Sequence, residues 1–462
     1  MTLIKSISGI RGTIGPSIGD DLTPLDAVRF ASAYAKWIKS RTDAKPLVVI
    51  GRDARPSGEM ISNLVSSSLL ASGIDVVDLG LSTTPTVEIA VPLENANGGI
   101  ILTASHNPVE WNALKLLNEK GEFISGEEGK ALLEIAEKED FDFVGVHDIG
   151  VLSKNDSYLQ KHIEMILALD LVNVDAIRNA VFKIAVDGVN SSGGVAVPML
   201  LKALGVNDII ELYCEPHGRF PHNPEPLKEH LGKIMSEIKN KGADLGIVVD
   251  PDVDRLAFIS ENGDMFGEEY TLVAVADYVL SKKAGNTVSN LSSTGALRDL
   301  SEKYGVKYSA SAVGEVNVVN LMKESNAVIG GEGNGGVILP ELHYGRDALV
   351  GIALALSLLA ERGLKMSELK SSYPQYEISK NKIQLQAGMD VDAILNGVEQ
   401  EFSEHEISTV DGVKINFDKE WVHLRKSNTE PIIRVYSESK DRAKADELAE
   451  RVIRQVEKIA GI

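Results

Sequence analysis

The sequence of 462 residues contains a single cysteine, Cys214. An intrachain disulfide is therefore excluded, and we expect a reducing, cytoplasmic environment. The start of the chain, residues 1–5, lacks the apolar core of a signal peptide, and no run approaches the roughly 20 apolar residues that span a bilayer. We therefore expect neither a targeting signal nor a membrane anchor.

Cations are scarce as well, with 47 Lys and Arg against 67 Asp and Glu and a net charge of −20. A nucleic-acid partner requires a basic surface, and an anionic membrane repels an acidic protein. The charge thus argues against both partners. A small anionic molecule stays compatible with it, because a few local cations can dominate one cleft.

What the sequence has is the composition of a folded soluble protein, with 44% hydrophobic and 25% charged residues. The length predicts about three or four domains. Oligomeric state does not follow from these numbers, and we expect a monomer or a homodimer.

Short apolar runs alternate with amphipathic helical patterns in the first third of the chain. Residues 47–50 and 98–102 are typical of buried strands, and a helix is predicted beyond Ser57. The order of strand, Gly/Ser-rich loop and helix returns at residues 184–204 and again from residue 287. We therefore expect three related α/β units, each with a parallel sheet covered by helices on both faces.

The C-terminal segment has strand patterns without long intervening helices, and its last helix carries one apolar face. This pattern predicts an α+β unit. The predicted domains are residues 1–150, 151–256, 257–368 and 369–462.

The first loop that could take part in a reaction, Thr103 to Pro108, directly follows a predicted strand. Residues beyond the carboxyl end of a parallel strand face the ligand crevice of the sheet. Ser105 could serve there as a nucleophile or a phosphoryl carrier if neighbouring groups activate it, and His106 is next to it in sequence. Taken alone, a polar turn closed by Pro108 is the preferred explanation of this loop.

The second loop carries Asp250, Asp252 and Asp254 after the apolar strand at residues 245–249. Carboxylates at alternate positions of an extended segment point the same way and repel one another unless a cation lies between them. Ligands made only of oxygen indicate a hard ion, Mg²⁺ before Ca²⁺ or Mn²⁺. An EF-hand is excluded because Arg255 stands where that loop requires glycine.

The third loop, Gly330 to Gly336, formally contains the dinucleotide pattern G-x-G-x-x-G. An apolar segment follows it instead of a helix, so the pattern fails its structural test. The glycines would let a ligand approach the backbone, with Glu332 and Asn334 bonding to hydroxyl groups. A glycine-rich hairpin is the alternative.

The fourth loop, Arg425 to Pro431, combines cations, hydroxyls and an amide, and Arg434 follows it. This set suits a phosphate cradle, although an exposed polar turn is an equal explanation. Arg11 and Lys115 are further cations that could face a ligand or merely the solvent. Together, the four loops suit phosphoryl transfer on a sugar phosphate.

With these four motifs in the same order and at the same spacing, the chain resembles the α-D-phosphohexomutase family over essentially its full length. That family includes phosphoglucomutase, phosphomannomutase and phosphoglucosamine mutase. Lesser matches are residues 51–58 and 83–85. The resemblance implies three related α/β domains and a C-terminal α+β domain around a central cleft.

The resemblance also implies a reaction, the interconversion of hexose 6-phosphate and hexose 1-phosphate. Ser105 would carry the phosphoryl group, donate it to the sugar and form a 1,6-bisphosphate, which would turn around in the cleft and also serve as the activator. Asp250, Asp252 and Asp254 would hold Mg²⁺, with a phosphoryl oxygen on Ser105 completing the site.

Residue roles carry over to matching positions. Arg11 and Lys115 would lie near the reacting phosphate with His106, and Lys115 would be the general acid/base. Substrate-binding residues would be the following: Arg255, Glu332, Asn334, Arg425, Ser427, Asn428, Thr429 and Arg434.

The sequence departs from the family pattern at three positions. Asn334 replaces the usual serine of the sugar loop, Gly336 replaces a histidine found in many relatives, and Glu315 stands where many carry a basic residue. The chain looks most like the archaeal-type branch, and we predict a phosphoglucosamine mutase, with phosphoglucomutase or phosphomannomutase as the alternative.

Two rival classes use the same residues. A Mg²⁺-dependent phosphatase would share the serine and the metal, but it has no need to hold a second phosphate. A non-catalytic sugar-phosphate sensor would tend to lose the serine or the metal ligands, which are all present here.

Overall fold

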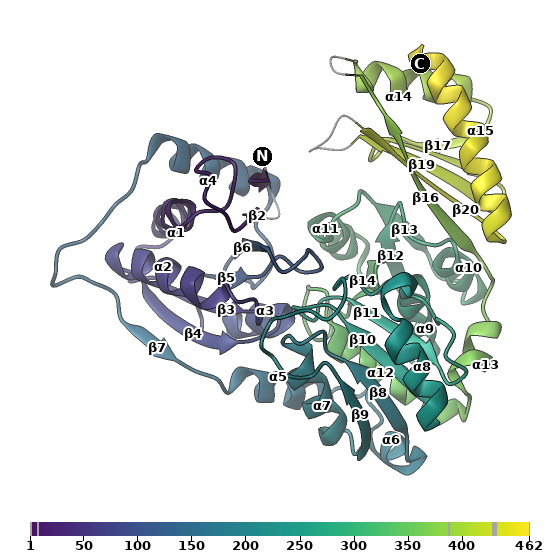
Figure 1. Cartoon of the computed structure of the whole chain (residues 1–462), viewed down its shortest axis with the longest axis horizontal. Coiled ribbons are helices and arrows are strands. Elements are labelled where there is room, and N and C mark those ends of the chain that lie inside the picture. Colours follow the sequence, from purple (N-terminus) through teal and green to yellow (C-terminus); the bar gives the residue numbers. More distant parts are fainter. Residues whose placement is uncertain (1, 7–8, 387–388, 427–431, 462) are drawn as a thin grey trace. The chain divides into compact units, whose positions relative to one another are not determined.

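The computed structural model describes residues 2–6, 9–386, 389–426 and 432–461 (Figure 1). The chain divides into two compact units. The first unit comprises residues 1–271 and 335–367, and the second comprises residues 272–334 and 368–462. None of the described helices is both long enough and apolar enough to cross a membrane.

The first sheet of the first unit has seven strands in the order β1-β2-β6-β5-β3-β4-β7. Their bounds are β1 Ile4–Ser6, β2 Gly9–Thr13, β3 Leu47–Arg52, β4 Asp75–Leu81, β5 Gly98–Leu102, β6 Trp111–Leu117 and β7 Leu152–Lys154. Four helices accompany this sheet: α1 Pro24–Lys39, α2 Gly58–Ala71, α3 Thr84–Leu93 and α4 Gly126–Lys138.

Helices cover both faces of this sheet. Val48 and Ile50 of β3 belong to one buried cluster, with residues of α1, α2 and α4, while Val49 between them belongs to a second cluster, with residues of α3. This alternation follows from the two-residue period of a strand.

The expectation of a parallel sheet is correct only for the half formed by β5, β3, β4 and β7. β3 runs parallel to β4 and β5, but β6 runs antiparallel to both β5 and β2. Strand β6 was not predicted, because Asn112 and Lys115 interrupt its apolar run. Both polar side chains are buried within the fold, where other groups of the protein bind them.

The second sheet of the first unit has the order β11-β10-β8-β9. Its strands are β8 Lys183–Asp187, β9 Asp208–Leu212, β10 Leu245–Val249 and β11 Leu256–Ser260. The remaining elements of the unit are α5 Tyr158–Leu167, α6 Val174–Ala180, α7 Gly193–Ala203, the 3₁₀ turn η1 Lys228–His230, α8 Gly232–Lys241, β15 Gly336–Ile338 and α12 Ala348–Arg362. The turn between β10 and β11 holds the three predicted metal ligands.

The second unit begins with a sheet in which β12 (Asn286–Asn290) lies between parallel neighbours β13 (Tyr308–Ser311) and β14 (Ala327–Glu332). Helices α10 (Ala296–Lys303) and α11 (Glu315–Ser325) follow the strands as the sequence pattern predicts. Helices α9 (Glu268–Lys282) and α13 (Met366–Ser371) cross the boundaries of the unit.

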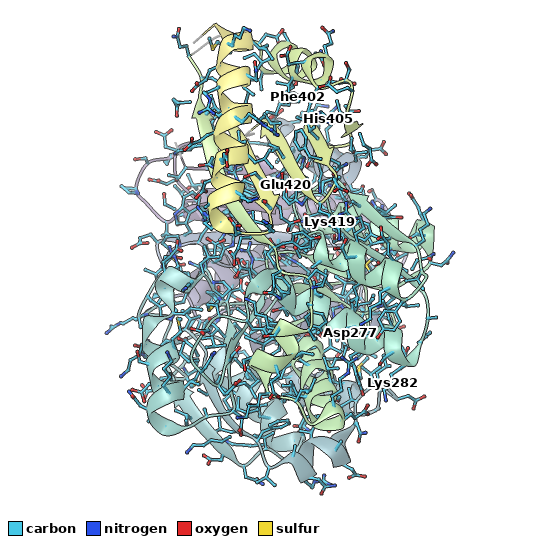
Figure 2. The ribbon with its side chains drawn as sticks, turned by 90° about the vertical axis from the view of Figure 1, so that its right-hand side faces the viewer. Asp277, Lys282, Phe402, His405, Lys419 and Glu420 are labelled. Atoms are coloured by element: carbon cyan, nitrogen blue, oxygen red, sulfur yellow. The ribbon has the colours of Figure 1, made fainter. Side chains whose placement is uncertain are left out.

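The C-terminal part is an antiparallel sheet in the order β16-β20-β19-β18-β17. Its elements are β16 Glu377–Gln384, α14 Val391–Glu401, β17 Glu406–Ser408, β18 Val413–Phe417, β19 Glu420–Lys426, β20 Ile432–Ser439 and α15 Arg442–Ala460. The predicted apolar face of α15 packs with α14 against one face of the sheet (Figure 1). Just beyond α14, the rings of Phe402 and His405 (Figure 2) contact Phe417 of β18.

The other face of this sheet contacts the loop after β12. Trp421 and His423 alternate along β19 with residues of the helix-covered core, so they point to the opposite face. His423 Nδ1 lies 2.9 Å from the Ser292 hydroxyl, and Glu438 Oε1 accepts hydrogen bonds from Trp421 Nε1 and Gly295 N–H. The second unit is therefore tied together by buried polar contacts.

Candidate active site

Ser105 lies in the loop that follows β5, and its backbone is left-handed, with φ of 49°. Its N–H donates to Thr103 Oγ1 at 2.9 Å, and its hydroxyl donates to Asp250 Oδ2 at 2.6 Å. The residue is buried, with 6% exposed. His106 Nδ1 is 3.5 Å from the serine oxygen. The structure thus brings the serine loop and the aspartate loop together as expected.

Arg55, from the loop between β3 and α2, holds the serine loop in place. Its guanidinium donates to the carbonyls of four residues at 2.5–2.9 Å, namely Ser105, Asn107, Pro108 and Trp111. Its Nε pairs with Asp53 Oδ2 at 3.0 Å, and both side chains are fully buried. In the sequence analysis, residues 51–58 were only a lesser motif match. The signal that could have indicated this role was an arginine two residues after an aspartate, between an apolar strand and a helix.

Asp250, Asp252 and Asp254 are fully buried, and one oxygen of each lies within 4.8 Å of the others. The prediction of an extended conformation for residues 250–254 is wrong. The segment is a tight turn in which the backbone of Val253 is left-handed, with φ of 65°. The turn, not strand alternation, brings the carboxylates together. In the described part of the chain, Asp252 Oδ1 and Asp254 Oδ1 accept no hydrogen bond although they are buried.

Three side chains surround these carboxylates. Lys115 Nζ is 2.7 Å from Asp252 Oδ2 and 3.3 Å from Asp254 Oδ2. Arg346 Nη2 is 2.7 Å from Asp254 Oδ2, and the Thr84 hydroxyl donates to Asp252 Oδ2 at 2.6 Å. Arg346 and Thr84 were not predicted as site residues; Thr84 lay in a minor motif match, and nothing marked Arg346.

The charges shift the acidities of these groups in opposite directions. Burial and the neighbouring carboxylates raise the pKa of Asp250 well above its ordinary value. Burial alone would raise the pKa of Asp252, but Lys115 outweighs it and leaves the pKa lowered. Burial would lower the pKa of Lys115, yet Asp252 and Asp254 raise it. A buried, all-oxygen donor set with two orphaned oxygens fits a hard divalent cation.

Two arginines lie near His106, the neighbour of Ser105 in the chain. Arg11 Nη1 donates to Asn107 Oδ1 at 3.0 Å, and Arg255 Nη1 pairs with Glu225 Oε1 at 3.2 Å. Burial and the charge of Arg255 lower the pKa of Arg11, and burial with both arginines lowers the pKa of His106 well below its ordinary value. Arg11 and Arg255 thus bring positive charge to the serine loop, as a phosphoryl group requires.

Glu332 stands at the end of β14 in the second unit. Its Oε1 accepts from Asn290 Nδ2 at 2.9 Å and from Gly314 N–H at 3.1 Å, and Asn334 Nδ2 lies 3.4 Å from Oε2. The glycine-rich segment is the end of a strand and a turn, so the exclusion of a dinucleotide loop agrees with the structure. The carboxylate of Glu332 is thereby held in a fixed orientation.

Arg425 and Arg434 lie directly opposite each other on β19 and β20, and Lys382 of β16 lies opposite Arg434. These three cations form a row, which we call the cation row, on the sheet face away from α14 and α15. Like charges in register repel unless an anion joins them. Arg425 Nε also lies 2.7 Å from Asp411 Oδ2. The sequence missed Lys382 because only the strand register brings it here.

The other predicted members of the phosphate loop, Ser427, Asn428 and Thr429, lie outside the described residues. Among the predicted site residues that the structure describes, those brought together in the first unit are Ser105, His106, Lys115, Arg11, Arg255 and the three aspartates. The second unit holds Glu332, Asn334, Arg425 and Arg434.

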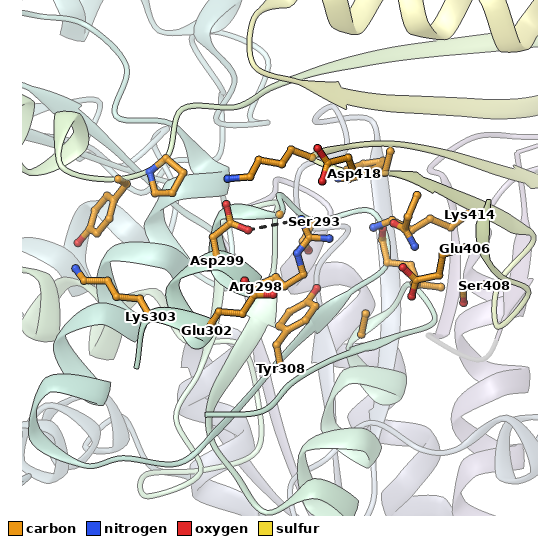
Figure 3. A pocket seen from close by; sticks show the side chains of 18 of the residues that line it. Ser293, Arg298, Asp299, Glu302, Lys303, Tyr308, Glu406, Ser408, Lys414 and Asp418 are labelled. Carbon is orange, nitrogen blue, oxygen red and sulfur yellow. Dashed lines mark hydrogen bonds and ion pairs between the residues drawn. The ribbon is translucent and has the colours of Figure 1, made fainter. Parts of the chain in front are cut away.

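The second unit also has a cavity of about 1150 Å³ (Figure 3). Arg298 and Asp299 of α10 lie on one side of it, and Glu406 of β17 and Lys414 of β18 lie on another. Among the described residues, none of the predicted site residues lines this cavity. Its mixed charge distinguishes it from the positive surroundings of Ser105.

Four family models match the chain in order. Those described as phosphoglucomutase/phosphomannomutase alpha/beta/alpha domains I, II and III match residues 3–143, 156–263 and 267–376, and the C-terminal domain matches residues 380–455. The protein is thus a phosphohexomutase, an isomerase with three α/β domains and a C-terminal domain. The chain belongs to the phosphoglucomutase/phosphomannomutase family, which confirms the resemblance drawn from its four motifs.

Individual relatives agree. A phosphoglucomutase/phosphomannomutase from Thermococcus kodakarensis is 38% identical over 97% of each chain. A probable phosphoglucosamine mutase from Methanopyrus kandleri is 33% identical over 98% of each chain. A solved structure of a phosphoglucomutase/phosphomannomutase family protein from Burkholderia thailandensis matches with a TM-score of 0.85 at 25% identity. The match covers 100% of this chain and 98% of the Burkholderia chain.

Proposed function

We propose that the protein interconverts hexose 6-phosphates and hexose 1-phosphates by way of a phosphorylated Ser105. The observation that carries the proposal is the buried Ser105 hydroxyl, 2.6 Å from a carboxylate of the aspartate cluster, beside a histidine on which the charges of Arg11 and Arg255 act. In the first transfer, the Ser105 O–P bond breaks as a sugar hydroxyl bonds to phosphorus and loses its proton. In the second, the other phosphate of the bisphosphate returns to Ser105.

Asp250, Asp252 and Asp254 would hold Mg²⁺ with an oxygen on Ser105. The orphaned oxygens Asp252 Oδ1 and Asp254 Oδ1 support this assignment, and so does the absence of nitrogen or sulfur from the donor set. When bound, the ion would neutralise charge that develops on the transferring phosphoryl group.

The residues around Ser105 would divide the remaining work. Lys115, which pairs with Asp252 and Asp254, is our candidate for the general acid/base that moves the proton of the sugar hydroxyl. Arg11 and His106 would position the phosphoryl group. Arg55 would position Ser105 by binding backbone carbonyls of its loop, and Asp53 would do so by accepting hydrogen bonds from Arg55 Nε and the Thr103 hydroxyl.

Substrate binding would engage both units. Glu332 and Asn334 would bind sugar hydroxyls, and Arg255 would bind the sugar phosphate. The cation row would hold the distal phosphate with Ser427, Asn428 and Thr429. We place the domains at residues 1–150, 151–256, 257–368 and 369–462.

We assign glucosamine 6-phosphate as the preferred substrate, with a hexose 1,6-bisphosphate as activator. The name of the Methanopyrus relative supports this choice. Glucose and mannose 6-phosphates are the second candidates, because the relative from Thermococcus carries the name phosphoglucomutase/phosphomannomutase.

A ³¹P NMR competition assay tests the proposal. Glucosamine, glucose and mannose 6-phosphates are mixed with Mg²⁺, enzyme and a trace of hexose 1,6-bisphosphate. Growth of a 1-phosphate resonance is expected, and the fastest sugar identifies the substrate. Release of free orthophosphate alone would indicate a phosphatase and contradict the proposal.

Ser105→Ala should abolish this turnover while sugar-phosphate binding is kept. The matched control is Ser66→Ala, because Ser66 is also buried but bonds only within its own helix, to the Ser62 carbonyl. Full activity of Ser105→Ala would remove Ser105 from the mechanism.

A further inference from the structure

A second cluster of potential metal ligands lies in the first unit and shares no residue with the aspartate cluster. It consists of His162 on α5, together with His343 and Asp347 before α12. One ligand atom of each lies within 4.8 Å of the others. Neither the sequence patterns nor the proposed reaction gives these residues a role.

The two imidazoles converge on a single carboxylate oxygen. His162 Nε2 lies 2.9 Å from Asp347 Oδ2, and His343 Nε2 lies 3.4 Å from the same oxygen. Tetrahedral zinc, with bonds near 2.0–2.1 Å, separates its ligand atoms by about 3.3 Å. The two observed distances bracket that value.

The other nitrogen of each imidazole faces an oxygen from helix α3. His162 Nδ1 is 3.0 Å from Thr86 Oγ1, and His343 Nδ1 is 3.5 Å from Glu88 Oε2. Histidines that bind metals characteristically have an oxygen at the nitrogen that does not bind, which orients the ring and fixes its tautomer. This second observation points to a ligand at the Nε2 side of both rings.

Asp347 is oriented in the same way. Its Oδ1 caps helix α12 by accepting hydrogen bonds from Leu349 N–H at 2.8 Å and Val350 N–H at 3.3 Å. Only Oδ2 is left facing the imidazoles. The helix cap therefore fixes the carboxylate with Oδ2 turned toward both imidazoles.

Burial gives the cluster the character of a structural site. His162 and Asp347 are fully buried, and the His343 side chain is 12% exposed, which leaves a route for an ion to enter. Glu88 is buried beside them, so the region holds two carboxylates. Buried carboxylates require a cationic partner.

Two arrangements would supply that partner. Protonated imidazoles could pair with Asp347; burial would raise the pKa of Asp347, but the facing histidines lower it. A divalent ion could instead replace the protons. The two imidazole nitrogens and one carboxylate oxygen suit zinc and not the Mg²⁺ that an all-oxygen site prefers.

We propose that His162, His343 and Asp347 bind a zinc ion, with water as the fourth ligand and with Thr86 and Glu88 orienting the histidines. The site joins segments far apart in the chain, since 185 residues separate His162 from Asp347. It is independent of the proposed phosphoryl transfer.

The test measures zinc on the full-length chain without an affinity tag. The protein is stripped with a chelator, returned to excess Mg²⁺ to occupy the aspartate cluster, and titrated with zinc alone by calorimetry and elemental analysis. One zinc per chain is expected, together with a higher unfolding temperature. Binding of less than one equivalent overturns the proposal.

Variants identify the ligands. His343→Ala should lose the zinc and its thermal effect, and Thr86→Val should bind zinc about 10–100-fold more weakly. His147→Ala, which removes an exposed histidine, and Asp254→Asn, which alters the aspartate cluster, should each keep one equivalent. Unchanged zinc binding in both Thr86→Val and His343→Ala would contradict the assignment. Loss of zinc binding in Asp254→Asn would contradict it as well.

Discussion

At the scale of single residues, the serine loop is held by a neighbour that contributes no group to the proposed chemistry. Arg55 donates to four backbone carbonyls in and after this loop and pairs with Asp53, all in a buried position. A planar guanidinium can form this set of bonds, but an ammonium cannot. The position of Ser105 thus depends on the shape of Arg55 as well as on its charge.

Arg55→Lys should therefore lower kcat by about 100-fold with little change in KM, because the serine is displaced while the substrate contacts stay. Steady-state kinetics and the phosphoserine content by mass spectrometry measure the effect. Arg52→Lys is the matched control, since Arg52 ends the preceding strand β3 and its side chain donates to the Asp53 carbonyl and not to the serine loop. An unchanged kcat in Arg55→Lys, with circular dichroism like that of the parent, would contradict the positioning role.

Asp250 illustrates a conflict between stability and the proposed metal site. Burial and two neighbouring carboxylates act against its charge. Asp250→Asn should therefore raise the stability of the metal-free protein by about 0.5–2 kcal/mol, lower activity strongly, and remove the stabilisation by Mg²⁺. Thermal unfolding with and without Mg²⁺ measures this. Asp264→Asn, at an exposed turn, should change none of the three.

At the scale of elements, strand register creates a binding surface that no single segment contains. Lys382, Arg434 and Arg425 come from three adjacent strands and share one face. Lys382 and Arg434 are exposed, so each contributes modestly. The charges act together only because the strands align them.

Lys382→Ala should raise the KM for the sugar phosphate roughly fivefold with kcat nearly unchanged, as expected for the loss of about 1 kcal/mol from an exposed charge. The effect should shrink at high salt. Lys380→Ala is the control, because Lys380 is also exposed on β16 but lies opposite Tyr436. Equal effects of the two variants would remove Lys382 from the phosphate site.

The contact between β19 and the loop after β12 depends on a neutral histidine. His423 Nε2–H donates to the Asp411 carbonyl at 2.6 Å, so Nδ1 is free to accept from the Ser292 hydroxyl. Burial, with the charges of Lys414 and Arg425, lowers the pKa of His423 to about 4. Protonation would leave Nδ1–H without its acceptor and place a cation in a buried position.

This shift predicts a pH effect with a definite sign. An unfolded histidine titrates near pH 6.5, so between about pH 6.5 and 4 the unfolded chain binds more protons than the native one, and stability falls as the pH is lowered, by at most about 3 kcal/mol. Urea unfolding across this window measures the slope, which His423→Gln should flatten. His405→Gln, elsewhere in the second unit, should keep it; a slope that is the same in both variants contradicts the argument.

At the scale of the whole molecule, the features that could be predicted from the sequence are those that local residue patterns determine. Apolar strands, Gly/Ser loops and the face of the last helix indicated the α/β and α+β parts, and the four motifs indicated the family. The sequence could not predict contacts set by tertiary packing. The buried partners of Asn112 and Lys115 in strand β6, the bonds of Arg55 and the register of Lys382 all involve residues more than forty positions away in the chain.

The two compact units should respond differently to Mg²⁺, because all three aspartates lie in the first. At 100 times its dissociation constant, Mg²⁺ should stabilise the first unit by about 2.7 kcal/mol and leave the second unchanged. Trp421 is the only tryptophan of the second unit, so Trp421→Phe and the double variant Trp37→Phe/Trp111→Phe report the units separately by fluorescence. An equal shift in both would show that the units unfold together.

The left-handed backbone of Ser105 also limits which amino acids its position can accept. Threonine carries the same hydroxyl, but its branched β-carbon disfavours this conformation strongly, at a cost on the order of 1–3 kcal/mol. Asparagine and aspartate tolerate it far better. Of the two natural residues with an aliphatic hydroxyl, serine therefore fits this turn with less strain, and natural variants of this chain should not carry threonine at this position.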